Sequence, residues 1–221
     1  MNETYKVQVQ DLVDDLKAVF THAGLGGEAG EYKLLTQSFL YKFLNDKFLY
    51  QAKVLDESNT YENLLAMSED DYDWLLEDIG TSTAWLKSEQ LIETLHRQQN
   101  EATFYESFEN TLNQIAIDNN DIFSVHTDGD TAIRLFDERL ITDTISDSSK
   151  RNEVAKAIIN LLARVKFDET IFSQGFDFFS TLFEYMIKDY NKDGGGKYAE
   201  YYTPHSVAKI IADILVGNDQ P

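Results

Sequence analysis

The sequence of 221 residues contains no cysteine, only two prolines, and about half as many basic as acidic residues. The absence of cysteine excludes disulfides, thiolate nucleophiles and cysteine-based zinc sites, and it fits a reducing compartment. With prolines only at positions 204 and 221, most of the chain is free to form helices. No apolar run approaches the roughly eighteen residues of a membrane span, and the first residues do not resemble a signal peptide. We therefore expect a cytoplasmic protein without membrane segments.

The charge balance limits the partners that the chain can bind. Lysine and arginine number 19 against 39 aspartates and glutamates, which gives a formal net charge of −20. Affinity for nucleic acid comes largely from neutralised phosphates, which an acidic surface repels. The chain is thus a poor candidate for direct contact with a DNA groove. Its charge favours solubility or contact with a basic partner.

Apolar residues recur with helical periodicity along most of the chain, and strand-like alternation is rare. The predicted helices cover approximately residues 9–20, 31–50, 69–79, 104–115, 149–165 and 172–190, and a further packed segment is expected at 85–95. Ser68 is placed to cap one of them and Gly80 to end it. A polar loop is expected from residue 118 to 130, with a short strand at 122–125. These patterns predict a mainly all-α fold.

A distinctive segment lies near the end of the chain. Three glycines at 194–196 interrupt the preceding helix, and Glu200, Tyr201, Tyr202, Thr203 and Pro204 follow. Thr203 can cap a helix, and Pro204 fits the first helical position because no backbone N–H is needed there. Apolar residues from 207 to 215 continue at helical spacing. The segment therefore predicts a loop, an aromatic pair and a capped helix.

This segment resembles the opening motif of amino-type DNA methyltransferases, in particular the modification subunit of type I restriction–modification systems. Ala199 stands where glycine is common in the family. The resemblance implies that residues 200–204 contribute to a site for S-adenosylmethionine. Aromatic faces can cover an apolar or cationic ligand, and free N–H groups at a helix start can meet a carboxylate.

Two further stretches are similar to the same family. Glu31-Tyr-Lys and residues 39–48 correspond to the Glu-Tyr-Lys and Phe-Leu-Lys-Tyr-Leu-Ser-Asp runs of its N-terminal helical domain. Here Tyr41 and Lys42 are in swapped order, and Asn45 replaces serine. Residues 183–187 stand where the family has a Tyr-Glu-Tyr-Leu-Leu type run. The three similarities follow the family's order from end to end, although residues of such spacing are also common in helical cores.

The resemblance also implies what this chain lacks. The family holds its target amino group with an Asn/Asp-Pro-Pro-aromatic loop and seats the cofactor on a Gly-rich turn, and neither motif occurs after Gly196. We therefore expect residues 1–193 to form an N-terminal helical domain and residues 194–221 to open a truncated methyltransferase domain, with no catalytic residue present. The parent protein would methylate adenine N6 in DNA. It would act with a specificity subunit, a second modification subunit and a restriction subunit, and it would reach DNA through the complex.

Two other interpretations remain open. An acidic helical interaction protein, acting as a DNA mimic or binding a basic partner, would share this composition. Asp189, Asn191, Asp193 and Glu200 also fit the spacing of an EF-hand calcium loop. Against calcium, Gly196 occupies the apolar position of that loop, and Pro204 starts the next helix late. The four histidines have no metal-ligand spacing, so no metal site is predicted.

Overall fold

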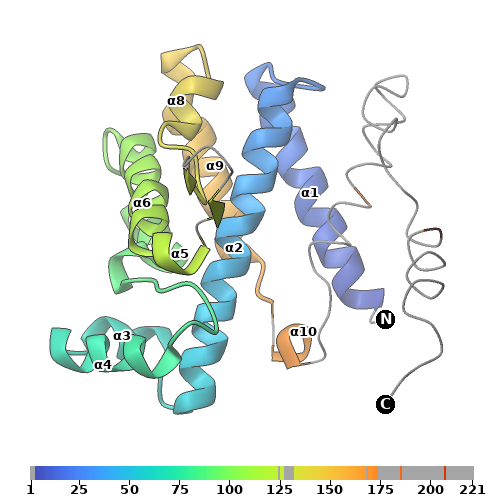
Figure 1. Cartoon of the computed structure of the whole chain (residues 1–221). Coiled ribbons are helices and arrows are strands. Elements are labelled where there is room, and N and C mark those ends of the chain that lie inside the picture. The colour runs from blue at the N-terminus through green and yellow to red at the C-terminus, as the bar shows by residue number, and fades with distance from the viewer. Residues whose placement is uncertain are drawn as a thin grey trace. The chain divides into compact units, whose positions relative to one another are not determined.

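The computed structural model describes residues 3–123, 125–126, 132–167 and 169–173, together with Tyr185 and Val207 (Figure 1). The chain divides into two units, Met1–Phe178 and Phe179–Pro221. Nearly all described residues belong to the first unit, and the fold below is that of this unit. The boundary predicted at residues 193 and 194 lies outside the described residues and stays a prediction.

Two long helices open the chain. Helix α1 spans Glu3–Ala23 and α2 spans Ala29–Leu55, so α2 extends beyond the predicted range at both ends. Gly24 ends α1 with a φ of 96°, a conformation that favours glycine. The buried carboxylate of Glu31 accepts a hydrogen bond from the Gly27 N–H at 2.6 Å, which closes the turn between the two helices.

Two shorter helices follow at the end of α2. Helix α3 spans Tyr61–Ala66 and α4 spans Glu69–Ile79. The Ser68 hydroxyl accepts a hydrogen bond from the Asp71 N–H at 3.2 Å, as expected of an N-cap. Gly80 ends α4 with a φ of 58°. The sequence-based prediction of this helix is confirmed at both ends.

The middle of the chain combines short helices with one small hairpin. A 3-10 turn at Ser88–Gln90 (η1) leads into α5, Ile92–Gln98, and then α6, Phe104–Asp118. Helix α7 spans Asn120–Phe123, and antiparallel strands β1 (Val125–His126) and β2 (Ala132–Ile133) follow. The strand predicted at 122–125 is therefore wrong for its first two residues. The Asn119 carbonyl accepts hydrogen bonds from the N–H groups of Ile122 and Phe123, and this keeps the chain helical there.

The last described helices complete the unit. Helix α8 spans Leu140–Thr144, a 3-10 turn (η2) spans Ser148–Lys150, α9 spans Arg151–Arg164 and α10 spans Glu169–Ser173. The predicted start of α9 at Ser149 is two residues early, because Asp147 caps the preceding turn by accepting from the Ser149 N–H. Most of the stripe predicted to continue to residue 190 lies outside the described residues.

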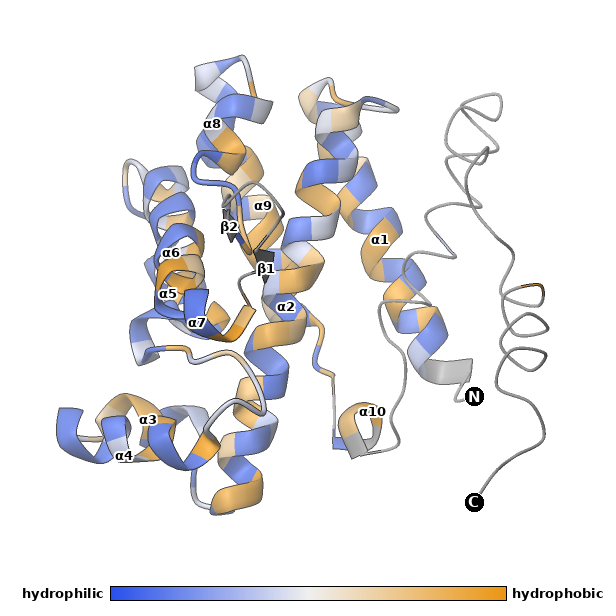
Figure 2. Ribbon diagram, viewed as in Figure 1, coloured by the Kyte–Doolittle hydropathy of each residue, from blue (hydrophilic) through white to orange (hydrophobic). Residues whose placement is uncertain are grey.

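Helices α2 and α9 organise the core. Helix α9 packs against α1, α5 and α6, and α2 packs against α1, α4, α8, α9 and α10. In Figure 2 their ribbons alternate between hydrophobic and hydrophilic residues, as amphipathic helices do. The largest fully buried side chains include Phe20, Phe39, Tyr41, Phe48, Phe104 and Phe108. The prediction of a mainly α-helical fold is confirmed, and none of the described helices is long and apolar enough to cross a membrane.

Candidate functional site

The residues predicted to hold the cofactor, Glu200 through Pro204, lie outside the described residues. The same holds for the four residues of the calcium hypothesis. Within the predicted helix that follows, Val207 is helical and exposed. These site predictions stay predictions, and the structure shows instead what residues 41–46 of α2 do.

A buried ion pair lies in the middle of α2. The Lys42 Nζ atom lies 3.0 Å from Oδ1 and 2.9 Å from Oδ2 of Asp46, and the two residues are only 3% and 8% exposed. Burial lowers the pKa of Lys42, the charge and hydrogen bond of Asp46 oppose this shift, and the charge of Lys166 adds to it. The Lys42 ammonium also lies 5.6 Å from the centroid of the Phe167 ring.

The carboxylate of Asp46 links α2 to two other segments, one directly and one through Asn45. Its Oδ2 atom accepts the Phe167 N–H at 3.0 Å, and its Oδ1 atom accepts the Asn45 amide at 2.8 Å. The side-chain oxygen of Asn45, Oδ1, in turn accepts a hydrogen bond from the Ile92 N–H at 2.9 Å. One buried cluster thus joins α2 to the first turn of α5 and to the segment after α9. Its polar groups are satisfied by partners of the chain itself, which is the condition for burying them.

Tyr41 also joins α2 to a later segment, in this case the turn at Gln90. Its hydroxyl donates to the Gln90 carbonyl at 2.5 Å, and its ring meets that of Phe108 edge-on at 6.2 Å between centroids. Burial raises the pKa of this hydroxyl well above the usual value of a tyrosine. Tyr41, Asn45 and Asp46 therefore each hold the backbone of a later segment, and Lys42 supplies the counter-charge of Asp46.

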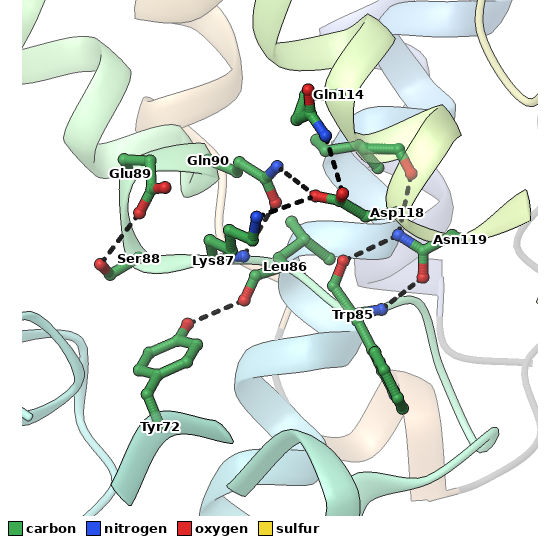
Figure 3. Close-up of polar contacts among 11 residues, drawn as sticks. Tyr72, Trp85, Leu86, Lys87, Ser88, Glu89, Gln90, Gln114, Asp118 and Asn119 are labelled. Atoms are coloured by element: carbon green, nitrogen blue, oxygen red, sulfur yellow. Dashed lines mark hydrogen bonds and ion pairs between the residues drawn. The ribbon is translucent and has the colours of Figure 1, made fainter. Parts of the chain in front are cut away.

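The segment that Tyr41 reaches is itself fixed to the end of α6 (Figure 3). The Gln90 amide donates to Asp118 at 3.1 Å, and Lys87 Nζ lies 3.6 Å from the same carboxylate. Asn119 accepts the Trp85 N–H at 2.6 Å and donates to the carbonyls of Trp85 and Ile115 at 2.8 and 2.9 Å. Sequence reasoning assigned Asn119 only to a polar loop, and the pattern around it gave no signal of this role.

The Tyr72 hydroxyl of α4 completes this arrangement by donating to the Leu86 carbonyl at 2.8 Å. Three elements, α2, α4 and α6, thus each hold one part of residues 85–90. Residues 85–90 are partly buried, with Leu86 and Gln90 in the core, and the buried backbone groups of such a segment need partners, which side chains supply here.

A groove of about 560 Å³ lies beside the buried cluster. Leu49 and Tyr50 of α2, Tyr61 of α3, Leu91, Ile92 and Phe167 form its apolar lining. Lys53 and Glu169 lie at its charged border and pair with each other at 2.7 Å. The groove offers apolar and aromatic surface, and the buried charges in its lining, Lys42 and Asp46, are paired with each other.

The described part of the chain contains no group of histidine, aspartate or glutamate residues arranged to bind a metal ion. Most of its carboxylates are exposed or accept from backbone N–H groups, basic side chains, side-chain amides or hydroxyls, and Oε1 of the buried Glu31 has no hydrogen-bond partner among the described residues. The described residues therefore form contact surface around a packed and hydrogen-bonded interior.

Comparison with known proteins adds one finding. Residues 174–221 match the model of the family described as N-6 DNA Methylase. No curated protein and no solved structure matches the chain. The matched segment includes Glu200 through Pro204, on which the predicted cofactor site depends, and it begins before the predicted boundary at residue 194. The comparison supports a relationship between this chain and the adenine-N6 DNA methyltransferases, carried by its residues from 174 onward.

Proposed function

We propose that the chain is the N-terminal part of the modification subunit of a type I restriction–modification system. Its parent transfers a methyl group from S-adenosylmethionine to adenine N6 in DNA. The observation that carries this proposal is the match of residues 174–221 to N-6 DNA methylases. A helical unit stands before that match, in the order in which the modification subunits carry theirs.

In this proposal the segment from Glu200 to Pro204 forms one wall of the cofactor site. Its side chains suit that role chemically, because two aromatic faces can cover the cofactor and the start of a helix supplies N–H donors. The Glu200 carboxylate can accept hydrogen bonds from hydroxyl groups. The remaining walls and the groups that hold the target adenine belong to the family's Gly-rich and Pro-Pro motifs, which this sequence does not contain.

The helical unit then serves assembly and enclosure of DNA rather than catalysis. Its buried ion pair and the clamped residues 85–90 make a rigid body, and its net negative charge disfavours direct contact with phosphates. The partners in this role are the specificity subunit, a second modification subunit and the restriction subunit. DNA would be reached through the complex, in the cytoplasm.

Calorimetric titration with S-adenosylmethionine tests this function in the full-length parent. Replacing Tyr201 and Tyr202 with alanine removes the aromatic wall, so cofactor affinity should fall by about tenfold or more. Tyr198→Ala, on the loop before the motif, should leave affinity within about twofold. Equal affinities in wild type and the Tyr201/Tyr202 variant, with both folded, would show that the segment is only a helix start.

The chain of 221 residues alone should not bind the cofactor measurably, because a ligand of that size needs most of its surface enclosed. Binding by the chain alone would mean that its residues form a complete site.

A second candidate is an acidic interaction protein that acts without a methyltransferase domain. One specific observation favours it: residues 54–86 contain nine acidic residues and no lysine, arginine or histidine. The reading frame of the gene distinguishes the two candidates. Continuation into Gly-rich and Asn-Pro-Pro-aromatic motifs would support the methyltransferase, and a stop codon near residue 221 would support the interaction protein.

A further inference from the structure

Helix α4 presents a tryptophan to solvent in an unusual setting. Trp74 is 69% exposed, the largest exposure among the exposed large hydrophobic residues that the structure describes. The opposite face of α4 is packed in the core through Tyr72, Leu75, Leu76 and Ile79. Tryptophan is the residue most enriched at binding hot spots, and its exposure is costly unless a partner covers it.

The residues three and four positions before and after Trp74 are all acidic. Asp70 and Asp71 precede it by four and three positions, and Glu77 and Asp78 follow it by three and four, so all four neighbour it on the helix surface. They are exposed, and none of them forms an ion pair with any residue that the structure describes. Nor does Trp74 meet another ring or a cation there. The helix lies at the end of the unit opposite to α8 (Figure 1).

The acidic residues of this region have no basic residue in the same stretch, and of them only Glu62 pairs with a described basic side chain, that of Arg97. Because residues 54–86 carry nine acidic and no basic side chains, the negative potential is concentrated on α3, α4 and the turns beside them. A phosphate backbone would be repelled by this surface. A partner that covers it must therefore bring positive charge together with groups that can lie on an indole ring.

The protein already contains such an arrangement close by. The Arg97 guanidinium lies 4.8 Å from the centroid of the Tyr61 ring, and its NH2 group contacts Glu62 at 2.6 Å and Glu93 at 3.3 Å. One arginine thus stacks on an aromatic ring and pairs with two carboxylates. The exposed face of α4 offers the same groups, a ring between carboxylates, without the arginine.

We propose that this face, defined by Asp70, Asp71, Trp74, Glu77 and Asp78, is a docking surface for an arginine-rich segment of another protein subunit. A guanidinium stacks on the indole while its neighbours pair with the carboxylates, which favours arginine over lysine. The inference rests on the proposed role of the helical unit in assembly. Its test uses neither cofactor nor DNA, so the docking surface can be refuted without refuting the methyltransferase function, and the reverse also holds.

The experiment titrates a labelled oligoarginine peptide into the 221-residue chain at about physiological ionic strength, where weak nonspecific pairing is screened. The wild type should bind it and protect Trp74 from a fluorescence quencher. Trp74→Ala should weaken binding by about tenfold, and Trp74→Phe should restore part of the loss because it keeps a ring. An oligolysine peptide of equal length should bind more weakly to the wild type, and Trp74→Ala should affect it less.

Charge controls complete the test. Glu77→Gln with Asp78→Asn should weaken oligoarginine binding by about fivefold, whereas Asp11→Asn with Glu28→Gln, an equal charge change elsewhere, should alter it by less than about twofold. The variants are expected to remain folded, because all five side chains are exposed, and circular dichroism checks this. Equal binding by wild type and Trp74→Ala, or equal losses in the two charge variants, would refute a defined surface. Spermine, a polycation without guanidinium groups, can also be used to displace the oligoarginine peptide. If it displaces the peptide equally well from wild type and Trp74→Ala, the attraction is only diffuse.

Discussion

The buried pair of Lys42 and Asp46 gives the sharpest test of the interior. Replacing Asp46 with leucine removes both contacts to Lys42, at 2.9 and 3.0 Å, and the acceptors for the Asn45 amide and the Phe167 N–H. It also leaves the Lys42 ammonium, 3% exposed, without its counter-charge. Removing one partner of a buried pair costs about 3–5 kcal/mol, so we expect a loss of unfolding free energy in that range.

A double variant distinguishes the coupling between the two charges from the other hydrogen bonds of Asp46. Lys42→Met combined with Asp46→Leu removes both charges, so the penalty of an unpaired ammonium disappears. The lost acceptors for Asn45 and Phe167 still cost about 1–3 kcal/mol. We therefore expect the double variant to be more stable than the sum of the single losses predicts, by about 2 kcal/mol or more.

Urea unfolding followed by circular dichroism measures these differences through the midpoint and slope of each transition. The exposed pair of Arg139 and Asp143 is the matched control, because it has the same four-residue spacing with side chains 62% and 59% exposed. Its coupling should be about 0.5 kcal/mol or less. Losses in the Lys42 and Asp46 cycle that add to within about 0.5 kcal/mol would refute the reasoning.

Three further predictions concern other parts of the chain. Burial raises the pKa of Tyr41 and Tyr72 in the folded protein, whereas unfolded tyrosines ionise near about pH 10. The stability that the two protonated hydroxyls contribute is full below that pH and is lost as pH rises above it. Tyr41→Phe and Tyr72→Phe should therefore each make the urea midpoint fall less steeply above about pH 10. Parallel plots of urea midpoint against pH for wild type and variants would contradict this. Asn119→Ala should lower the unfolding free energy by about 1–3 kcal/mol because it removes the side-chain partners of the half-buried Trp85 N–H and carbonyl, whereas the exposed Asn120→Ala should cost about 0.5 kcal/mol or less. Calcium at about millimolar concentration should leave the melting temperature unchanged, and a calcium-specific rise that disappears in Asp189→Ala would establish the calcium loop.

Local signals account for most of what the sequence predicted correctly. A cap, a helix end and an apolar stripe are each set by residues within about four positions, so Ser68 and Gly80 could be assigned without knowledge of the fold. The wrong strand prediction at residues 122–123 also depends on a local interaction, within four positions. Apolar residues between polar ones suggested a strand, but the Asn119 carbonyl held the chain in a helical turn.

The clamps on residues 85–90 could not be predicted, because their partners are distant in sequence. Asn119 bonds to Trp85 across 34 positions, and Tyr41 bonds to Gln90 across 49. Nothing in a polar run such as residues 118–121 shows which member will be buried. The cofactor segment is the opposite case: its motif was visible in the sequence and lies within the range that matches the family model, and its role and geometry both stay predictions.

The family-like residues of α2 show why resemblance and chemistry must be kept apart. The swapped order of Tyr41 and Lys42 still places a hydroxyl on the Gln90 carbonyl and an ammonium on Asp46. Asn45, in place of serine, still supplies an acceptor, here for the Ile92 N–H. Each of these polar groups reaches a backbone group or a counter-charge within the core. Residues 41–46 thus join helices in this unit, and the relationship to adenine-N6 methyltransferases rests on residues 174–221 alone.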